Sequence, residues 1–370
     1  MSARIIAAAE SPYTRHPHPT STTESLLVDA FCRALASAEL DRSAVDGLGV
    51  ASFTLQPDHV ADLAWRLGLR TRWLMEDTNG GAAAINMLQH AIRAVEAGDA
   101  RTIILLAGDL FDRSSFQRLV DNYNAATATY LAPIPFRGPN TLFAFLTQRH
   151  MDAHNLGRED YGHLVVAQRR WAEQNPSAVY RSPLSLDDYM SAPVVAAPLH
   201  RYDCPPVVSG ADAIVVAKAE HGVAVRAINA SNNRDAQGGD GLQTGLSDIA
   251  SALWDTANFG PEELDAAYVY DDYPAMTLIQ LDDLGLVPDH DIARFLREST
   301  LPVNTSGGQL SAGQAGAASG MHGVVEAVSQ LLGTFDDRTP IGARRAVVTG
   351  YGMVIYRYGT CANAAVLEAT

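Results

Sequence analysis

The sequence predicts a layered α/β fold built from two similar halves. Strand-like and helix-like segments alternate along the chain, which is typical of a sheet covered by helices. A unit that starts with a glycine-rich turn and continues as helix and strand occurs twice, at 79–107 and at 306–349. The 370 residues are enough for two halves that each bury a core. We therefore expect an internally duplicated structure with largely parallel strands.

The first half begins with short apolar segments of the kind that form buried strands. Residues 4–9 and 46–51 are predicted strands, and 24–38 between them has apolar residues at helical spacing. A second helix is expected at about 82–98, directly before the strand 102–107. This order gives two strand–helix units in succession.

The second half repeats that order. A helix near 248–257 leads through an acidic turn into the strand 267–270, and a helix at 319–332 leads into the strand 346–349. Alanines at the starts of the helices 82–98 and 319–332 permit close approach of their backbones. We expect these two helices to lie buried between two sheets, in a five-layer αβαβα arrangement.

The chain divides at about residue 230. Residues 1–230 form the first half, which carries an inserted cap at about 110–199 that is rich in proline. The cap should have helices of its own, one of them at 159–174. Residues 231–370 form the second half.

The composition excludes several classes of protein. Hydrophobic residues make up 47% and charged residues 19%, as in globular proteins. The net charge of −15 has no basic run to offset it, so we expect neither a nucleic acid nor a membrane surface as partner. No apolar run approaches the ~20 residues of a membrane helix, and none resembles a signal peptide. Three scattered cysteines fit a reducing, cytoplasmic location, and neither cysteines nor histidines have metal-site spacing.

Three features could carry chemistry, and each has a structural alternative. The glycine-rich turns place backbone N–H groups at helix starts, where these groups can hold an oxyanion or simply let helices pack closely. Tyr270 and Asp271 end a predicted strand, where ligands bind in α/β sheets. Their segment can supply an acid or base, or form a solvated acidic loop. His322 lies early in a helix and either lines a site or is a hydrogen-bonded structural residue.

Four segments together resemble the sterol-carrier-protein-X-like branch of the thiolase superfamily. They are 150–176, which ends in Asn-Pro; 197–213, which contains Asp-Cys-Pro; 302–332, which contains the glycine-rich run; and 350–353, Gly-Tyr-Gly-Met. The likeness covers nearly the whole chain. It implies a thiolase-like fold, a homodimer, and a CoA thioester as substrate with no separate cofactor.

The catalytic side chains of that branch are missing from the matching positions. The nucleophilic cysteine would fall at about Gly81, the histidine base on Gln314 and a second cysteine on Val348. Covalent thioester exchange therefore has no candidate residue. The backbone N–H groups of Gly81 and Gly350 match those that form the oxyanion hole of the family, which needs no side chain.

Tyr270 makes the chain resemble the aldolase members of the branch. Those members cleave β-hydroxyacyl-CoA thioesters, notably of steroid side chains, and they pair with a small OB-fold, zinc-ribbon protein. They carry a second tyrosine near the position of Gln314, and Tyr351 is the candidate substitute here. Tyr273, three residues further along the loop, need not face the same cleft and is the control residue for Tyr270.

The expected function is a carbon–carbon lyase (retro-aldolase), or a condensing enzyme, acting on a β-hydroxyacyl-CoA by acid/base chemistry. Tyr270 is the candidate base, with Asp271 or Asp272 as the group that tunes it, and the role requires a lowered pKa or a proton relay. The alternatives are a non-catalytic scaffold subunit of an acyl-CoA enzyme complex and an acyltransferase with an unrecognised nucleophile. The expected catalytic residues are Tyr270, Asp271, Gly81 and Gly350, and the expected substrate-binding residues are Asn304, Gln314, His322 and Tyr351.

Overall fold

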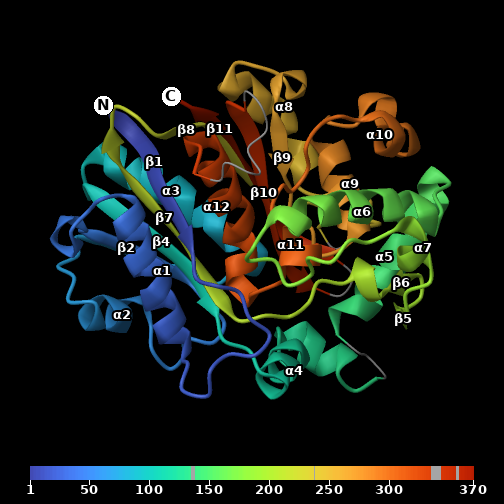
Figure 1. Cartoon of the computed structure of the whole chain (residues 1–370), viewed down its shortest axis with the longest axis horizontal. Coiled ribbons are helices and arrows are strands. Elements are labelled where there is room, and N and C mark those ends of the chain that lie inside the picture. Colours follow the sequence, from blue (N-terminus) through green and yellow to red (C-terminus); the bar gives the residue numbers. More distant parts are fainter. Residues whose placement is uncertain (135–137, 237, 335–342, 356–357) are drawn as a thin grey trace.

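The computed structural model describes residues 1–134, 138–236, 238–334, 343–355 and 358–370. Within them, nine strands form one sheet in the order β3-β2-β4-β7-β1-β8-β11-β10-β9, and two short strands form a separate ribbon (Figure 1). The first five strands of that order belong to one half-sheet and the last four to the other.

The elements of the first half follow the predicted order. The structure has β1 (Ser2–Glu10), α1 (Thr23–Ser37), β2 (Gly47–Ala51), α2 (Val60–Arg66), β3 (Trp73–Glu76), α3 (Ala83–Ala97) and β4 (Thr102–Asp109), and later β7 (Gly210–Ala219). A single 3-10 turn, Gly80–Ala82, leads into α3. Gly98 ends that helix with a φ of 83°, a left-handed conformation that glycine adopts without strain.

The elements of the second half also match the prediction. They are β8 (Val223–Asn232), α8 (Leu246–Ala257), β9 (Ala266–Tyr268), α9 (Pro274–Asp283), α10 (Ile292–Glu298), α11 (Gly308–Ala312), α12 (Ser319–Leu332), β10 (Arg345–Ile355) and β11 (Tyr358–Ala369). A 3-10 turn, Gly316–Ala318, precedes α12. β8 pairs with β11, and residues 220–222 connect β7 to β8.

The segment between β4 and β7, which we call the cap, has helices and a short ribbon of its own. It comprises α4 (Arg113–Asp121), a π-helical turn (Thr127–Leu131), α5 (Pro139–His154), α6 (Arg158–Gln174), α7 (Leu186–Met190) and the ribbon of β5 (Val194–Ala196) and β6 (Leu199–His200). In Figure 1, α5, α6, α7 and the ribbon lie on the right, away from β1 and β2, and α4 lies at the lower centre.

The expectation of largely parallel strands is wrong, because the sheet is mixed. Only the pairs β2–β3, β2–β4 and β9–β10 are parallel within the described residues. The other pairings are antiparallel. β10 continues into β11 after two residues, and so short a connection can join only antiparallel neighbours.

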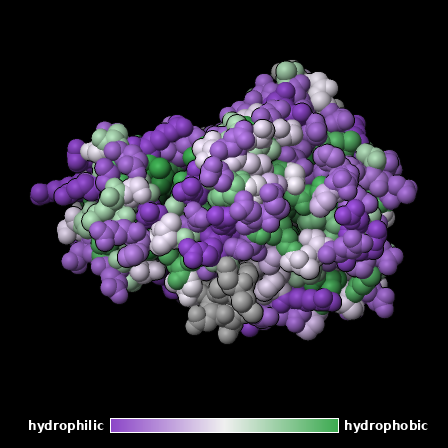
Figure 2. Space-filling model, turned by 90° about the horizontal axis from the view of Figure 1, so that it is seen from above, coloured by the Kyte–Doolittle hydropathy of each residue, from purple (hydrophilic) through white to green (hydrophobic). Residues whose placement is uncertain are grey.

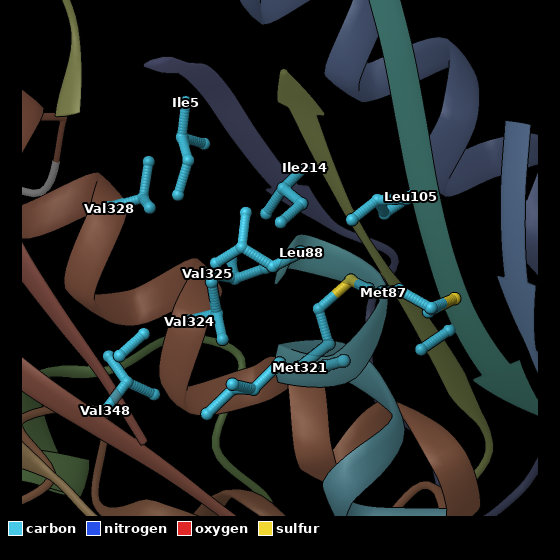
Figure 3. Packing of buried hydrophobic residues seen from close by; sticks show 14 of the residues in the cluster. Ile5, Met87, Leu88, Leu105, Ile214, Met321, Val324, Val325, Val328 and Val348 are labelled. Atoms are coloured by element: carbon cyan, nitrogen blue, oxygen red, sulfur yellow. The ribbon is translucent and has the colours of Figure 1, made fainter. Parts of the chain in front are cut away.

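The five-layer arrangement is confirmed by how the core divides. α3 and α12 pack in one cluster with residues from both half-sheets, including Leu105, Ile214, Val348 and Leu367 (Figure 3). Alternate residues of the same strands point away from α3 and α12. Leu106 of β4 packs with α1 and α2, and residues of β10 and β11 such as Val347 and Val366 pack with α8 and α9. Twelve of the 14 residues of α12 are buried, as a helix between two layers requires.

The two half-sheets meet at one pair, Ile5 with Val223, so hydrogen bonding makes them formally one sheet rather than the expected two. The outermost strands of that sheet are β3 and β9, and β9 is bridged on its outer side to Val303, while β4 lies inside, between β2 and β7. The apolar segment 101–106 is therefore paired within the chain and offers no edge to a second copy.

Polar groups cover most of the face shown in Figure 2, and hydrophobic groups lie scattered between them. Within the described part of the chain, no helix has both the length and the apolar character needed to cross a membrane.

Candidate active site

A cavity of about 200 Å³ lies where the cap meets the turns that follow the strands. Its floor comes from both halves: Gly81 before α3, Tyr270 after β9, Gln314 before α12, and Tyr351 in β10. Its wall comes from the cap and is mainly apolar, with Phe111, Phe116, Leu119, Val120, Leu142 and Phe143. Four of the eight predicted site residues therefore meet in one pocket.

Tyr270 and Gly81 fit each other in the pocket floor. A Cβ atom added at Gly81 would overlap the Tyr270 ring and the carbonyl oxygen of Tyr351. The Tyr270 ring thus occupies the space into which a side chain at position 81 would project. The Tyr270 backbone is held on both sides, since its N–H donates to Thr349 Oγ1 (3.0 Å) and its carbonyl accepts from Gln280 Nε2 (2.6 Å).

The hydroxyl of Tyr270 keeps its proton at neutral pH. Burial raises its pKa well above the usual value, and the neighbouring Asp272 and Tyr123 raise it further, while a hydrogen bond with Gln314 opposes them. The lowered pKa that a free tyrosine base needs is therefore not found. A base role for Tyr270 requires a relay that takes the proton onward.

The carboxylate in the pocket is Asp272, not the expected Asp271. Asp271 accepts hydrogen bonds from the Gln309 N–H (2.9 Å) and from Gln168 Nε2 (3.1 Å), so it anchors the glycine-rich turn. It touches Gly308, which has a φ of 61° and no room for a Cβ atom. Asp271 lines a separate small cavity, whereas Asp272 lines the pocket of Tyr270.

Gly350 lies behind the pocket floor. A Cβ atom there would press on Asn363 Oδ1 and on the Gly81 carbonyl oxygen, 2.8 Å away. Two residues further along β10, Gly352 does line the pocket, and a Cβ atom at Gly352 would lie 2.9 Å from the Gly81 nitrogen. The glycines of β10 and of the turn before α3 that border the cavity are thus Gly352 and Gly81.

Asn304 and His322 support the site from behind rather than lining it. The Asn304 side chain acts as a strand partner for Val269, accepting from its N–H (2.9 Å) and donating to its carbonyl (3.0 Å). His322 Nε2 lies 2.8 Å from Ser306 Oγ. Both line the small cavity next to Asp271, where backbone groups beyond the end of β9 need partners.

The cap contributes pocket residues that no sequence motif predicted. The Tyr123 hydroxyl accepts a hydrogen bond from the Met353 N–H, and burial raises the Tyr123 pKa to about 12. Tyr273 also lines the pocket, so it does not serve as a control residue outside the cleft. Its ring stacks on Phe143 (4.4 Å between centroids), and its hydroxyl donates to Asn140 Oδ1 (2.7 Å).

Asp109, at the end of β4, ties the two halves together beside the pocket. Its Oδ1 accepts hydrogen bonds from the N–H groups of Phe53 (2.7 Å) and Thr54 (2.8 Å), and its Oδ2 accepts from the Ala317 N–H (2.7 Å). Gly316 packs against the same carboxylate and has no room for a side chain. Asp109 therefore fixes the turn before α12 to the first half.

The buried carboxyls predict how stability depends on pH. Burial raises the pKa of Asp109 to about 6 and those of Asp271 and Asp283 to about 7. Unfolded carboxyls titrate near ~3.9, so from about pH 4 to about pH 7 the folded chain holds protons that the unfolded chain has lost. The free energy of unfolding should fall as pH rises through this window.

Urea unfolding at a series of pH values from about 4.5 to about 7.5 measures that slope. The Asp283→Asn variant removes one of the three groups, so its slope should be shallower than that of the wild type. A free energy of unfolding that rises across the window would contradict the assignment of these raised pKa values.

Within the described residues, no three His, Cys, Asp or Glu side chains are placed to hold a metal ion. The pocket thus offers backbone N–H groups, phenols, amides and one carboxylate. Such groups can bind a polar carbonyl compound, shift protons, and enclose an apolar substituent against the cap.

Known proteins similar to this chain in sequence belong to one superfamily. Residues 228–364 match the thiolase C-terminal domain-like family. The chain is 30% identical over 341 residues to the 17-hydroxy-3-oxo-4-pregnene-20-carboxyl-CoA lyase of Mycobacterium tuberculosis, covering 84% of this chain and 86% of the relative. It is 28% identical over 338 residues to the steroid side-chain-cleaving aldolase of Thermomonospora curvata, covering 84% and 85%.

The fold agrees with these sequence matches. A solved Ltp2-ChsH2(DUF35) aldolase superposes with a TM-score of 0.85 and 24% identity, over 100% of this chain and 98% of that one. The resemblance stated from the sequence motifs is confirmed. The chain belongs to the thiolase superfamily, in the family of its thiolase-like aldolases.

Proposed function

We propose that this protein is a carbon–carbon lyase that cleaves a β-hydroxyacyl-CoA by a retro-aldol reaction. The observation that carries the proposal is the Tyr270 ring seated on Gly81. It places a phenol where a thiolase-like nucleophile would project and leaves no space for such a nucleophile. The relatives named as a carboxyl-CoA lyase and a side-chain-cleaving aldolase support the same reaction class.

The pocket groups suit the two demands of that reaction. The β-hydroxyl must lose a proton, and the Tyr270 hydroxyl is placed to contact it. The electrons of the broken bond must be stabilised on the thioester oxygen as an enolate. The backbone N–H groups of Gly81, in the turn before α3, and of Gly352, in β10, are the candidate donors to that oxygen. Gln314, hydrogen-bonded to Tyr270, fixes the orientation of the phenol. The same groups would serve the reverse condensation.

None of the three cysteines is suited to act as a covalent nucleophile. Burial raises the pKa of Cys204 to about 12 and also raises that of Cys361, so both thiols stay protonated. Cys32 is exposed on α1, on the outer side of the first half-sheet. This distribution argues against the acyltransferase alternative.

We also propose a small OB-fold, zinc-ribbon partner and a homodimer. The solved aldolase that superposes on this chain is named as an assembly with a DUF35 component. For the homodimer, the free edge strand β3 is the available pairing surface: Leu74 in β3 is 42% exposed, and Trp65 in the neighbouring α2 is 81% exposed. β3 and α2 both lie away from the cap (Figure 1).

The proposed function is tested by incubating the protein with β-hydroxyacyl-CoA thioesters, alone and with a purified OB-fold, zinc-ribbon protein encoded beside it. Mass spectrometry should show a carbonyl product and a shorter acyl-CoA. If neither preparation yields these products from thioesters with apolar β-substituents, the scaffold alternative replaces the lyase.

A further inference from the structure

Asp272 presents a carboxylate oxygen that the protein does not satisfy. The side chain is 7% exposed, and its Oδ1 has no hydrogen-bond partner among the described residues. A buried acceptor without a partner costs about 1–3 kcal/mol, so such a group calls for an explanation. Asp272 lies in the pocket with Tyr270, which points to a role in the chemistry there.

The reaction lacks a proton acceptor if Tyr270 acts alone. Its raised pKa keeps the phenol neutral, and a neutral phenol can take a proton only if it passes its own proton on. Among the described residues that line the pocket, Asp272 is the one carboxylate, and no histidine, lysine or cysteine accompanies it. The other ionisable groups there are phenols, which are weaker acids than a carboxyl group.

We propose that Asp272 is the terminal acceptor of the β-hydroxyl proton, which reaches it by way of the Tyr270 hydroxyl. This inference rests on the proposed retro-aldolase function. Asp272 acts through Tyr270 and does not itself need to touch the substrate. Tyr270 and Asp272 line the same pocket, and after burial the Asp272 charge contributes most to the raised pKa of Tyr270.

The proton and electron balance of the step is complete without a further reactant. The β-hydroxyl gives its proton to the Tyr270 oxygen as the Tyr270 proton moves to the Asp272 carboxylate. The O–H electron pair forms the carbonyl at Cβ, the Cα–Cβ bond breaks, and its electron pair passes into the thioester enolate. Return of the proton through Tyr270 to Cα gives the shorter acyl-CoA and restores the Asp272 carboxylate.

The surroundings of Asp272 make its carboxylate a stronger base than an exposed one. Burial raises its pKa, and the adjacent Asp271 raises it further, while the N–H groups of Asp272 and Tyr273 oppose this. The other titratable groups that influence or are influenced by it are Tyr270, Tyr273, Tyr123 of the cap and Cys204 before β7. None of these groups is a cation, so nothing near Asp272 offsets the effect of burial, and its ionised form is a stronger base than an exposed carboxylate.

The test compares Asp272→Asn with Asp283→Asn, a buried carboxyl outside the pocket whose pKa burial also raises, to about 7. Wild-type kcat/KM should fall on the acid side, with an inflection above the ordinary carboxyl range. Asp272→Asn should lower kcat/KM about 10²–10⁴-fold and remove that inflection, with acyl-CoA binding retained by calorimetry. Asp283→Asn should keep the wild-type pH profile.

Chemical rescue separates a proton acceptor from a structural residue. Formate should raise the cleavage rate of Asp272→Ala at least about tenfold, because it can supply a carboxylate in the vacated space. It should not raise the cleavage rate of Tyr270→Phe. An Asp272→Asn enzyme with the full rate and an unchanged acid limb, or an Asp272→Ala enzyme that formate does not rescue, overturns the inference while the lyase function stands. A wild type that cleaves nothing overturns both.

Discussion

Replacing Tyr270 with phenylalanine should lower the rate of β-hydroxyacyl-CoA cleavage about 10²–10⁴-fold, the usual contribution of a general acid/base group. The substitution keeps the ring that fills the space in front of Gly81 and removes only the hydroxyl. The backbone hydrogen bonds of Tyr270 to Thr349 and Gln280 are independent of the hydroxyl, so the fold should be unchanged. Steady-state kinetics measure the expected loss of cleavage rate, and circular dichroism checks that the fold is unchanged.

Tyr202→Phe is the matched control. This variant also loses only a phenol hydroxyl, but at a half-buried site outside the pocket. The Tyr202 ring centroid there lies 5.3 Å from the Arg169 guanidinium carbon. Its activity should equal that of the wild type. If Tyr270→Phe cleaves the substrate at the wild-type rate, the mechanism built on the Tyr270 hydroxyl is wrong.

Placing any side chain at Gly81 should abolish activity, and cysteine should be no exception. A Cβ atom there overlaps the Tyr270 ring and the Tyr351 carbonyl oxygen, and the second of these is backbone that cannot rotate away. Overpacking of this kind typically costs about 1–3 kcal/mol, and the displaced phenol would no longer meet the substrate. Urea unfolding and cleavage assays on Gly81→Ala measure both effects.

Gly157→Ala is the control for the loss of a glycine, because a Cβ atom there meets its nearest neighbour, Asp160 Oδ2, at an ordinary 3.8 Å. It should lose little stability and no activity. Gly81→Cys, which recreates the residue type of a thiolase nucleophile, should neither cleave a 3-ketoacyl-CoA with free CoA nor gain an acyl adduct by intact-protein mass spectrometry. A stable acylated Gly81→Cys protein would show that the pocket floor is more adaptable than the packing implies.

The fold could be predicted where the sequence carries local signals. Apolar periodicity and small residues located α3 and α12 and their burial, because a helix between two sheets must be apolar around most of its surface. The strand directions could not be predicted in this way. They depend on pairings such as β1 with β7, between residues about 200 positions apart, which no local pattern reveals.

Pocket residues could be predicted only where the position of the backbone determines which side chain reaches the cavity. Tyr270 was expected from its place at a strand end, while Gly81, Gln314 and Tyr351 were assigned by the resemblance to the family motifs, and all four line the pocket. Beyond the end of β9 at Tyr268 the strand alternation stops, so the sequence could not tell which of two adjacent carboxylates enters the cavity. The glycine-rich turn holds Asp271 by the hydrogen bond from the Gln309 N–H, whereas Asp272 lines the pocket with Tyr270.

The wall of the pocket was beyond prediction for a different reason. Tyr123, Asn140 and Phe143 come from the cap, whose helices have no fixed spacing to the motifs of the two halves. Only the packing of the cap on α9, seen in the stack of Phe143 on Tyr273, brings them to the site. Tyr273 itself faces the cavity because this stack and its bond to Asn140 hold it there.

One measurement tests most directly whether the chain cleaves a carbon–carbon bond without a thiol intermediate. A β-hydroxyacyl-CoA is incubated with the wild-type protein and its partner in D₂O, with free CoA omitted. The account predicts equal amounts of carbonyl product and shorter acyl-CoA, with one solvent deuterium at Cα of the acyl-CoA from protonation of the enolate. Cleavage that depends on added CoA, or an acyl-CoA product without deuterium, would contradict it.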